Sequence, residues 1–568
     1  MNQERVQLLH LKFPWWKNKM KTFNEFSTAI TDHFIQNIIF IDDKAYNNNG
    51  PKDQHEFDAQ EVTKIFSKKG KICAVYKPQL VSDLEYLTSI ANKSDVTILD
   101  WQIVLDEESA EGDSHNDEED AEEDDVRGVY TKKIITALLG DIDNQHCIKL
   151  ILIYTGEVDL PKIASEINSA LTEKNISGFS INQDDPCTVM SNNCKIMVIS
   201  KANGGVGRAQ HLPQLANKTK SYEELPDFIS LQFTEMTSGL LSNFAMESLA
   251  EIRKNFHHIL TLFSKELDAA YLAHQTLLPN TFDANELLVQ LLSDTFSSII
   301  RYKNLNQFLN EDKVKLWLDH NIEDGVKPFY KDDGTQDNVF YQRNADILMR
   351  LLRSDSDVNN KFISSLISSD GQQLSTKKIG ILIKKYATTL FAEFDKIEEI
   401  NKDFAKLCYH RSAIFSPHHL PFLSLGTVVK STLDNGGYYI CIQQRCDSVR
   451  IQEGEMRRFL FISLEEVNDG GFNFLTPNGI KLKIDKSTYS LRTVKFSGTN
   501  GFALATKCEI DNKKYFEPSY YSKEKENSER FEFIIELKEL YAQRIVEEYS
   551  SSLSRVGLDE PEWVRRLN

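Results

Sequence analysis

The sequence predicts a multidomain α/β protein that begins with a doubly wound, five-stranded parallel sheet and continues into an α-helical domain and a small β-rich domain. Three observations lead to this prediction. Up to Lys201, five short apolar runs rich in Ile and Val end at polar or charged residues. Through the middle of the chain, apolar residues recur at three- and four-residue steps, and beyond Pro417 short β-type runs alternate with Gly-rich turns. A chain of 568 residues has room for about three domains.

The five apolar runs predict buried parallel strands, because such strands are covered on both faces and read as continuous hydrophobic stretches. The runs cover residues 38–41, 72–76, 96–99, 150–154 and 196–200. Four of them end at side chains able to do chemistry, namely Asp42 with Asp43, Asp100, Thr155 and Lys201. Ligands of open α/β sheets gather at the carboxyl ends of strands, so we expect these side chains to lie close together.

The segments between the strands predict covering helices and one insertion. Residues 1–34 are expected to supply a lead-in helix that packs on the sheet, and residues 130–139 and 160–174 two further amphipathic helices. Residues 106–125 hold 13 acidic residues and neither Lys nor Arg. A disordered acidic insertion is therefore expected over 106–126, either as a solvated loop or as an electrostatic lid on the neighbouring pocket.

The rest of the chain predicts two further domains. Residues 222–412 carry helical patterns, including 286–300, 338–353 and 377–407, and predict an α-helical domain. Residues 418–568 predict a β-rich domain with a closing helix at 528–551. Its β-type runs are 425–429, 438–443, 459–464, 480–484 and 491–496.

The polar set at the strand ends favours a magnesium-dependent pocket that accepts a phosphoryl group. An aspartate can attack phosphorus and form an aspartyl-phosphate, but its negative charge repels the incoming group. A hard cation held by two or three carboxylates cancels that repulsion and positions the phosphoryl oxygens. A lysine and a hydroxyl can contact the remaining oxygens as their charge develops.

With these five residues in this order and strand context, the segment 35–215 resembles the receiver domains of two-component response regulators, whose fold is flavodoxin-like. The resemblance implies that Asp100 is the phosphoacceptor and that Thr155 and Lys201 contact the phosphoryl group. It also implies Mg²⁺ binding by Asp42, Asp43, Asp100 and the backbone carbonyl of Gln102. Two positions depart from the usual receiver pattern. Ala202 follows the lysine where proline is usual, and Val198 stands where the aromatic switch residue is expected.

Composition and residue spacing argue against a membrane protein, a secreted protein and a nucleic-acid-binding protein. No uninterrupted apolar stretch is long enough to span a membrane, and the first residues lack the apolar core of a secretion signal. The eight cysteines show no paired metal-ligand spacing, which favours reduced thiols and a cytoplasmic location. No basic stripe of the nucleic-acid type is present, so neither a membrane nor a nucleic acid is expected as partner.

The chain combines an expanded receiver, a helical middle with the segment 235–243 and a β-rich end with the segment 441–450. In this arrangement it is similar, across most of its length, to the large receiver-domain proteins of bacterial two-component-like phage-defence operons, of the Detocs type. That resemblance implies a partner histidine kinase as phosphodonor and a sister effector protein. This chain has no visible effector domain, so we expect a signalling or phosphate-buffering (decoy) component without enzymatic activity beyond its own phosphotransfer and dephosphorylation. Two alternatives stay open: an unrecognised enzymatic or ligand-binding output in residues 222–568 that the receiver gates, and a scaffold with an idle pocket.

Overall fold

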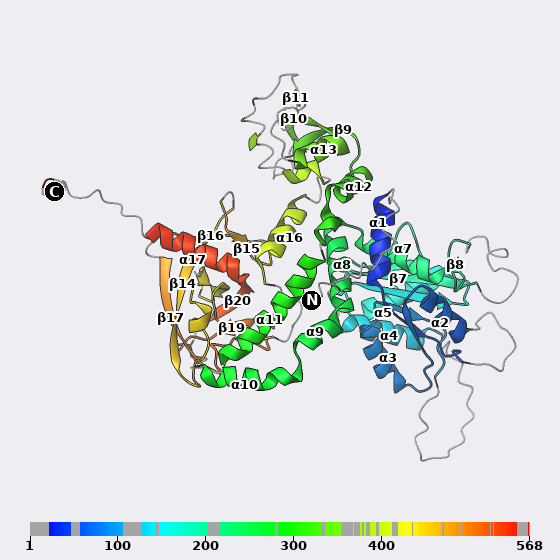
Figure 1. Cartoon of the computed structure of the whole chain (residues 1–568), viewed down its shortest axis with the longest axis horizontal. Helices are drawn as coiled ribbons and strands as arrows, with labels where there is room; N and C mark the ends of the chain where they lie inside the picture. Colours follow the sequence, from blue (N-terminus) through cyan, green and yellow to red (C-terminus); the bar gives the residue numbers. More distant parts are fainter. Residues whose placement is uncertain are drawn as a thin grey trace, which may run out of the picture. The chain divides into compact units, whose positions relative to one another are not determined.

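The structure is a computed structural model of the 568-residue chain. Its chain divides into two compact units (Figure 1). Unit 1 comprises Met1–Gly325 and Gln342–Phe362, and unit 2 comprises Val326–Tyr341 and Ile363–Asn568. The structure describes residues 22–46, 57–105, 127–141, 147–202, 216–278, 282–303, 305–330, 336–353, 367–368, 375, 377, 380–381, 387–392, 397–411, 419–433, 436–468, 471–487, 490–522, 524–525, 528–553 and 566. The predicted acidic insertion at 106–126 lies outside these residues.

Unit 1 is built on a sheet in which five strands pair in parallel in the order β2–β1–β3–β4–β7. Their bounds are β1 Asn37–Ile41, β2 Ile72–Tyr76, β3 Val96–Leu99, β4 Lys149–Thr155 and β7 Cys194–Lys201. Each coincides with one of the five predicted runs. The four central strands, β1, β3, β4 and β7, are buried almost throughout, which explains why they read as continuous apolar stretches.

The predicted number of five strands is wrong, because three further short strands extend the sheet beyond β7 to a total of eight. β5 (Ser180–Ile181) and β6 (Thr188–Met190) form an antiparallel hairpin that pairs with β7. β8 (Thr219–Lys220) pairs in parallel with the last residues of β7. Strands of two or three residues carry too few positions to give a periodic sequence signal.

Helices cover both faces of the sheet, as a doubly wound fold requires. One apolar cluster joins α1 (Phe23–Phe34) and α2 (Ala59–Lys68) to the sheet, and a second joins α3 (Asp83–Asn92), α4 (Val129–Gly140) and α5 (Leu160–Glu173) to the opposite face. The predicted lead-in helix is thus present as α1, and the helices predicted at 130–139 and 160–174 correspond to α4 and α5. Residues 1–21 lie outside the described residues.

Unit 1 continues into further helices. Their bounds are α7 Leu225–Thr237, α8 Leu240–Lys254, α9 Phe256–Leu262, α10 Asp268–Leu277, α11 Phe282–Tyr302 and α12 Glu311–Asn321, with the 3₁₀ turns η4 Lys265–Leu267 and η5 Leu305–Leu309. Of these, α7, α8 and α12 pack on α1. Polar contacts tie α8 to α1: the amide of Asn243 donates to Ser27 Oγ (2.9 Å), and His33 Nδ1 lies 3.1 Å from Glu247 Oε2. These contacts place α1 and the helices that follow the receiver in one compact unit. The predicted division of the chain into four parts stays a prediction.

A small three-stranded sheet follows, in the order β11–β10–β9. Its strands are β9 Gly325–Tyr330, β10 Gln336–Arg343 and β11 Ile367–Ser368. The helix predicted at 338–353 is therefore wrong in its first half, and only α13 (Ala345–Leu352) is helical. The side chain of Asn344 accepts a hydrogen bond from the backbone of Ile347 (2.8 Å), which caps α13 and marks the change from strand to helix.

Unit 2 contains a nine-stranded sheet, which agrees with the predicted β-rich segment. Its strands are β12 Thr427–Ser431, β13 Tyr438–Cys441, β14 Met456–Glu466, β15 Phe474–Leu475, β16 Lys481–Ile484, β17 Leu491–Ser497, β18 Thr506–Lys507, β19 Lys514–Phe516 and β20 Phe531–Glu536. The predicted closing helix at 528–551 is wrong in its first part, because Phe531–Glu536 pairs with β12 as strand β20. The helices of this unit are η6 Ala387–Leu390, α16 Ile397–Tyr409, η8 Arg445–Asp447 and α17 Glu539–Leu553.

Within the described part of the chain, no helix combines the length and the apolar character needed to cross a bilayer.

Candidate functional site

The carboxyl ends of β1 and β3 lie side by side, and backbone hydrogen bonds fix where their polar residues begin. The N–H of Asp42 donates to the carbonyl of Tyr76 at the end of β2 (3.1 Å). The N–H of Asp100 donates to the carbonyl of Ile41 at the end of β1 (2.9 Å). These bonds continue the parallel ladder by one residue, so both aspartates leave the sheet at the same level.

Three carboxylates come together at this edge. Asp42, Asp43 and Asp100 each offer a carboxylate oxygen, and these oxygens lie within 4.8 Å of one another. Asp42 and Asp100 are only 2% exposed, and Asp43 is half-buried. Like charges held this close in a buried site repel one another, so the cluster requires positive charge nearby.

Lys201 supplies part of that charge from the end of β7. Its Nζ lies 2.8 Å from Asp42 Oδ2 and 3.2 Å from Asp100 Oδ1, and its side chain is fully buried. Burial alone lowers the pKa of a lysine, but the charges of Asp100 and Asp42 outweigh it here and raise the pKa of Lys201 above its usual value. Lys201 is therefore a permanent cation between two of the three carboxylates.

One ammonium does not balance three carboxylates, and the remaining oxygens suit a hard divalent cation. Apart from the ion pair of Asp100 Oδ1 with Lys201, both carboxylate oxygens of Asp100 and Oδ1 of Asp43 are buried without a hydrogen-bond partner among the described residues. Burial raises the pKa of Asp100 to about 7, against the opposing effect of Lys201, and burial together with the Asp42 charge raises the pKa of Asp43. Unpaired carboxylate oxygens of this kind are the ligands that Mg²⁺ prefers, so the residues fit the metal that the sequence predicts.

Thr155 lies at the end of β4, between the acidic strand ends and Lys201 in the order of the sheet. It is fully buried, and its Oγ1 accepts a hydrogen bond from the N–H of Glu157 (3.1 Å). Gln102 lies in the segment after Asp100, where the N–H of Val104 donates to Asp43 Oδ2 (3.3 Å). Its predicted role as a carbonyl ligand stays a prediction.

Aromatic residues that the sequence did not single out enclose the lysine. Lys201 Nζ lies 5.6 Å from the ring centroid of Phe57 and 5.9 Å from that of Tyr154. Tyr222 completes the group, with ring centroids 5.9 Å from Phe57 and 6.1 Å from Tyr154. Phe57 and Tyr222 lie far from Lys201 in the chain, and no local pattern links them to it. Tyr154 was within reach of sequence reasoning, because it immediately precedes Thr155.

With this geometry established, the comparisons with known proteins assign the domain. Residues 34–206 match the family model of the response receiver domain. The predicted receiver domain is confirmed. No curated protein and no solved structure matches the chain. The match ends at residue 206, so it carries no information about the later helices or about unit 2.

The two departures from the usual receiver pattern have structural reasons in this receiver domain. The N–H of Ala202 donates to the carbonyl of Lys220 (3.1 Å), which continues the pairing of β7 with β8. Proline has no N–H and could not make this bond. Val198 is buried in the same apolar cluster as Val189 of β6 and Cys187, and its N–H donates to the carbonyl of Cys187 (2.9 Å) next to the pairing of β6 with β7.

The residue after the predicted phosphoacceptor is bound closely to α4. Thr131 Oγ1 donates to the backbone carbonyl of Asp100 (2.8 Å), and a second contact reaches the carbonyl of Trp101 (3.1 Å). Gly128, which caps α4, has φ +77°, and a Cβ at this position would lie 2.1 Å from Cζ2 of Trp101. The receiver therefore has a direct connection between Asp100 and the start of α4.

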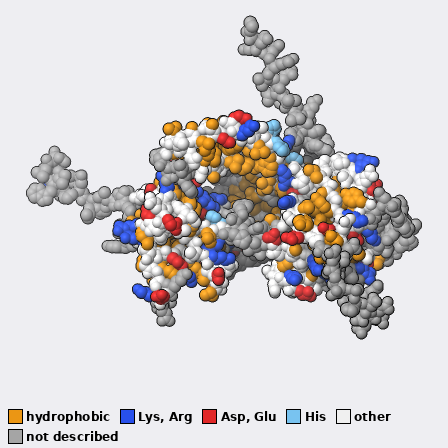
Figure 2. Space-filling model, turned by 90° about the horizontal axis from the view of Figure 1, so that it is seen from below, with side chains coloured by type: hydrophobic (Ala, Val, Ile, Leu, Met, Phe, Trp, Pro, Cys, Tyr) orange, Lys and Arg blue, Asp and Glu red, His pale blue; other side chains and the backbone are white. Residues whose placement is uncertain are grey.

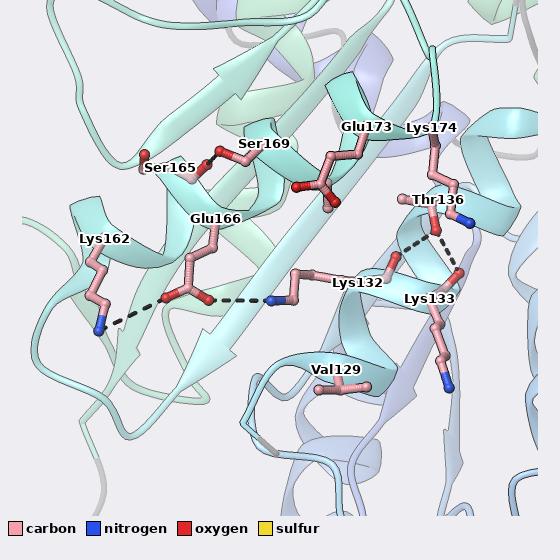
Figure 3. A pocket seen from close by; sticks show the side chains of 11 residues that line it. Val129, Lys132, Lys133, Thr136, Lys162, Ser165, Glu166, Ser169, Glu173 and Lys174 are labelled. Carbon is pink, nitrogen blue, oxygen red and sulfur yellow. Dashed lines mark hydrogen bonds and ion pairs between the residues drawn. The ribbon is translucent and has the colours of Figure 1, made fainter. Parts of the chain in front are cut away.

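A groove of about 470 Å³ lies between α4 and α5 of the receiver (Figure 3). Glu166 of α5 holds Lys132 of α4 at 3.4 Å and Lys162 of its own helix at 4.0 Å across this groove. A smaller hollow of about 130 Å³ shares Lys162 and Glu166 and reaches Trp101. Among the described residues that line the two hollows, none belongs to the carboxylate cluster, so the groove is separate from the predicted metal pocket.

Proposed function

We propose that this protein accepts a phosphoryl group on Asp100 as a response-regulator-like component of a two-component system. Mg²⁺ is held by Asp42, Asp43, Asp100 and the carbonyl of Gln102, and Thr155 and Lys201 contact the phosphoryl oxygens. The observation that carries the proposal is the cluster of three buried carboxylates, with a buried lysine bonded to two of them, inside a segment that matches the receiver family.

In the proposed reaction, a carboxylate oxygen of Asp100 attacks phosphorus of a phosphohistidine on a partner kinase. The new O–P bond forms as the N–P bond breaks, and the imidazole leaves with the bonding electron pair. Mg²⁺ held by Asp42, Asp43 and Asp100 would neutralise charge on the carboxylates and on the phosphoryl oxygens. Lys201 is already fixed by Asp42, so its ammonium is in place to stabilise the charge that shifts onto the transferred oxygens.

Water, acting on the same phosphorus, would hydrolyse the aspartyl-phosphate and return the carboxylate. Self-catalysed phosphotransfer and dephosphorylation are the only chemical activities in this proposal. Asp100 and Lys201 are buried, which supports a long-lived aspartyl-phosphate because water reaches such a site poorly.

We place the protein in the cytoplasm of a bacterium, as the phosphate-buffering member of an anti-phage two-component system that also contains a histidine kinase and a sister effector. The similarity to phage-defence receiver proteins supports this placement. Val198 supports a buffering role over a switching role, because the residue at the usual switch position is a small buried aliphatic and not an aromatic.

Hydrogen exchange with a phosphoryl mimic tests the proposal. Beryllofluoride with Mg²⁺ should protect amides around Asp42, Asp100 and Lys201 in the wild type. The Asp100→Asn variant and a sample without Mg²⁺ should show no protection, while Asp227→Asn, an exposed aspartate of α7, should behave as the wild type.

The extent of the change separates two functions. Protection confined to residues 34–206 is the result expected of a phosphate buffer. Changes that extend into unit 2 would contradict the phosphate-buffer function. They would favour the alternative function, in which the receiver gates an enzymatic or ligand-binding output in residues 222–568. Absence of any response in the wild type would contradict the phosphoacceptor itself.

A further inference from the structure

The buried ammonium of Lys201 faces aromatic rings as well as carboxylates. Its Nζ lies over the rings of Phe57 and Tyr154, 5.6 Å and 5.9 Å from their centroids, within the range of cation–π attraction. The surface of the molecule exposes many hydrophobic side chains (Figure 2), whereas these two residues are at most 4% exposed. A cation is attracted to a ring more strongly where water is excluded, so the two rings help to fix the position of the ammonium.

Tyr222 packs against both of these rings from the segment that follows β8. Its ring centroid lies 5.9 Å from that of Phe57, with the two rings nearly perpendicular at 80°, and 6.1 Å from that of Tyr154. Burial raises the pKa of Tyr222 to about 12, and the charges of Lys201 and Asp42 act on its hydroxyl in opposite directions. Tyr222 therefore belongs to the surroundings of the pocket, although it lies beyond the end of the receiver match at residue 206.

Three hydrogen bonds hold Tyr222 and the strand just before it in place. The hydroxyl oxygen of Tyr222 accepts from the N–H of Asp58 (3.1 Å), the residue that caps α2. The carbonyl of Lys220 in β8 accepts from the N–H of Ala202 (3.1 Å) and from the hydroxyl of Tyr154 (2.9 Å). A proline in place of Ala202 could not donate. The departure from the usual receiver pattern thus supports the strand that brings Tyr222 to the pocket.

We propose that Tyr222 is a positioning residue of the phosphoryl-accepting pocket, an inference that rests on the proposed function. Its ring keeps the aromatic wall of Phe57 and Tyr154 closed around Lys201. Without that ring, the two aromatic residues lose a shared partner, and space opens behind them that water can enter. Water beside the ammonium competes with the carboxylates for its hydrogen bonds, so Lys201 is held less firmly where the phosphoryl oxygens arrive.

Amine labelling of the full chain tests the wall without any phosphoryl group. Reductive methylation with formaldehyde, followed by peptide mass spectrometry, should leave Lys201 of the wild type almost unlabelled because its side chain is fully buried. Tyr222→Leu should react about tenfold faster at Lys201, because labelling no longer waits for the wall to open. Tyr222→Phe keeps the ring and should react like the wild type.

The matched control is Phe233→Leu. Phe233 is a buried aromatic residue of the same apolar cluster, but its ring packs on Phe34 of α1. Its replacement removes a ring of similar size, so urea denaturation should show a loss of stability like that of Tyr222→Leu, while Lys201 stays unlabelled. This comparison separates local opening at Lys201 from a general loss of stability.

Ala202→Pro provides a second route to the same change. It removes the bond to Lys220 and leaves every aromatic side chain in the sequence. If Tyr222→Leu does not fold, faster labelling of Lys201 in Ala202→Pro than in Phe233→Leu supports the inference, and equal labelling overturns it.

A second readout connects the wall to phosphoryl acceptance. Tyr222→Leu should bind beryllofluoride with Mg²⁺ roughly fivefold more weakly than the wild type, whereas Phe233→Leu should bind equally well. Equal labelling of Lys201 in these two variants would overturn the inference, as would fast labelling in Tyr222→Phe or an unchanged affinity in Tyr222→Leu. A wild type that binds no beryllofluoride would refute the proposed function, while the labelling comparison would still decide whether Tyr222 closes the wall.

Discussion

At the scale of single residues, the pocket is a cluster of like charges that folding brings together at a cost. Three carboxylates share one ammonium, and apart from the ion pair of Asp100 Oδ1 with Lys201, the oxygens of Asp100 have no hydrogen-bond partner among the described residues. Burying charge without compensation is unfavourable, so the metal-free receiver stores strain at the position where the proposed chemistry occurs. Two predictions follow at this scale.

The first concerns Asp100→Asn in metal-free solution. Burial raises the pKa of Asp100 from 3.8 to about 7, so the folded state holds a proton that the unfolded state releases. Stability of the wild type should therefore fall as pH rises from about 4 to 7, and the variant should escape this loss. Above pH 7, we expect urea denaturation to show the variant more stable by roughly 2 kcal/mol.

That difference should shrink below pH 4, where the carboxyl is protonated in both states, and on addition of Mg²⁺, which neutralises the cluster. A variant that is less stable than the wild type in metal-free solution above pH 7 would refute the assignment of Asp100 as a buried charge whose desolvation Lys201 does not fully offset.

The second prediction concerns Gly128, which touches the ring of Trp101. Gly128→Ala places a Cβ 2.1 Å from Trp101 Cζ2 at a backbone φ of +77°, so we expect a loss of roughly 2 kcal/mol or more in the free energy of unfolding. Gly178→Ala is the matched control, because its φ of +88° imposes similar strain with no atom within 4 Å. Equal losses in the two variants would mean that the contact with Trp101 contributes nothing.

At the scale of elements, α1 joins the receiver to the helices that follow it. His33 on α1 contacts Glu247 on α8 at 3.1 Å, and Asn243 of α8 bonds to Ser27 of α1. Through the hydrogen bond and the charge of Glu247, the pKa of His33 is raised above 6.5, although partial burial opposes the shift. The joint between α1 and α8 is therefore sensitive to pH.

The third prediction is a pH-dependent cost of His33→Gln. A raised folded-state pKa stabilises the protein fully below pH 6.5, and this contribution disappears as pH rises through the folded-state value. Thermal unfolding should show a cost of about 0.5–1 kcal/mol below pH 6.5 and almost none in alkaline solution, as for a partly exposed ion pair. His258→Gln, at an exposed position of α9, should show no such trend. A loss of stability in His33→Gln that does not change with pH would show that the charge of His33 does not stabilise the contact with Glu247.

The elements also show what sequence patterns can and cannot predict. The five parallel strands were predictable because each is a short apolar run, and four of them, β1, β3, β4 and β7, are buried and end at chemically distinctive residues. β20 was mistaken for a helix because Phe531, Phe533 and Ile534 also suit a helical face. Pairing with β12, a contact remote in sequence, decides in favour of the strand.

The pocket likewise contains residues that the sequence could predict and residues that it could not. Asp42, Asp43, Asp100 and Lys201 were predictable because parallel strands deliver their carboxyl ends to one edge. Phe57 approaches Lys201 from a segment far away in the chain, and Tyr222 packs against Phe57, so no spacing in the sequence signals this arrangement. The unusual Ala202 became intelligible only once β8 was known, since its N–H bonds to Lys220.

At the scale of the whole molecule, the chain forms two compact units, and the family match covers only residues 34–206 of unit 1. The proposed chemistry therefore lies within unit 1, and the family match does not extend to the nine-stranded sheet of unit 2.

The most direct test of the central claim is intact mass measurement after incubation of the full chain with a phosphorylated histidine kinase and Mg²⁺. The account predicts one added phosphoryl group per chain, mapped by peptide analysis to Asp100 and absent from Asp100→Asn or in the presence of a chelator. The matched variant Asp227→Asn should label as the wild type does. Labelling that persists in Asp100→Asn, or that needs no divalent cation, would contradict the proposed pocket.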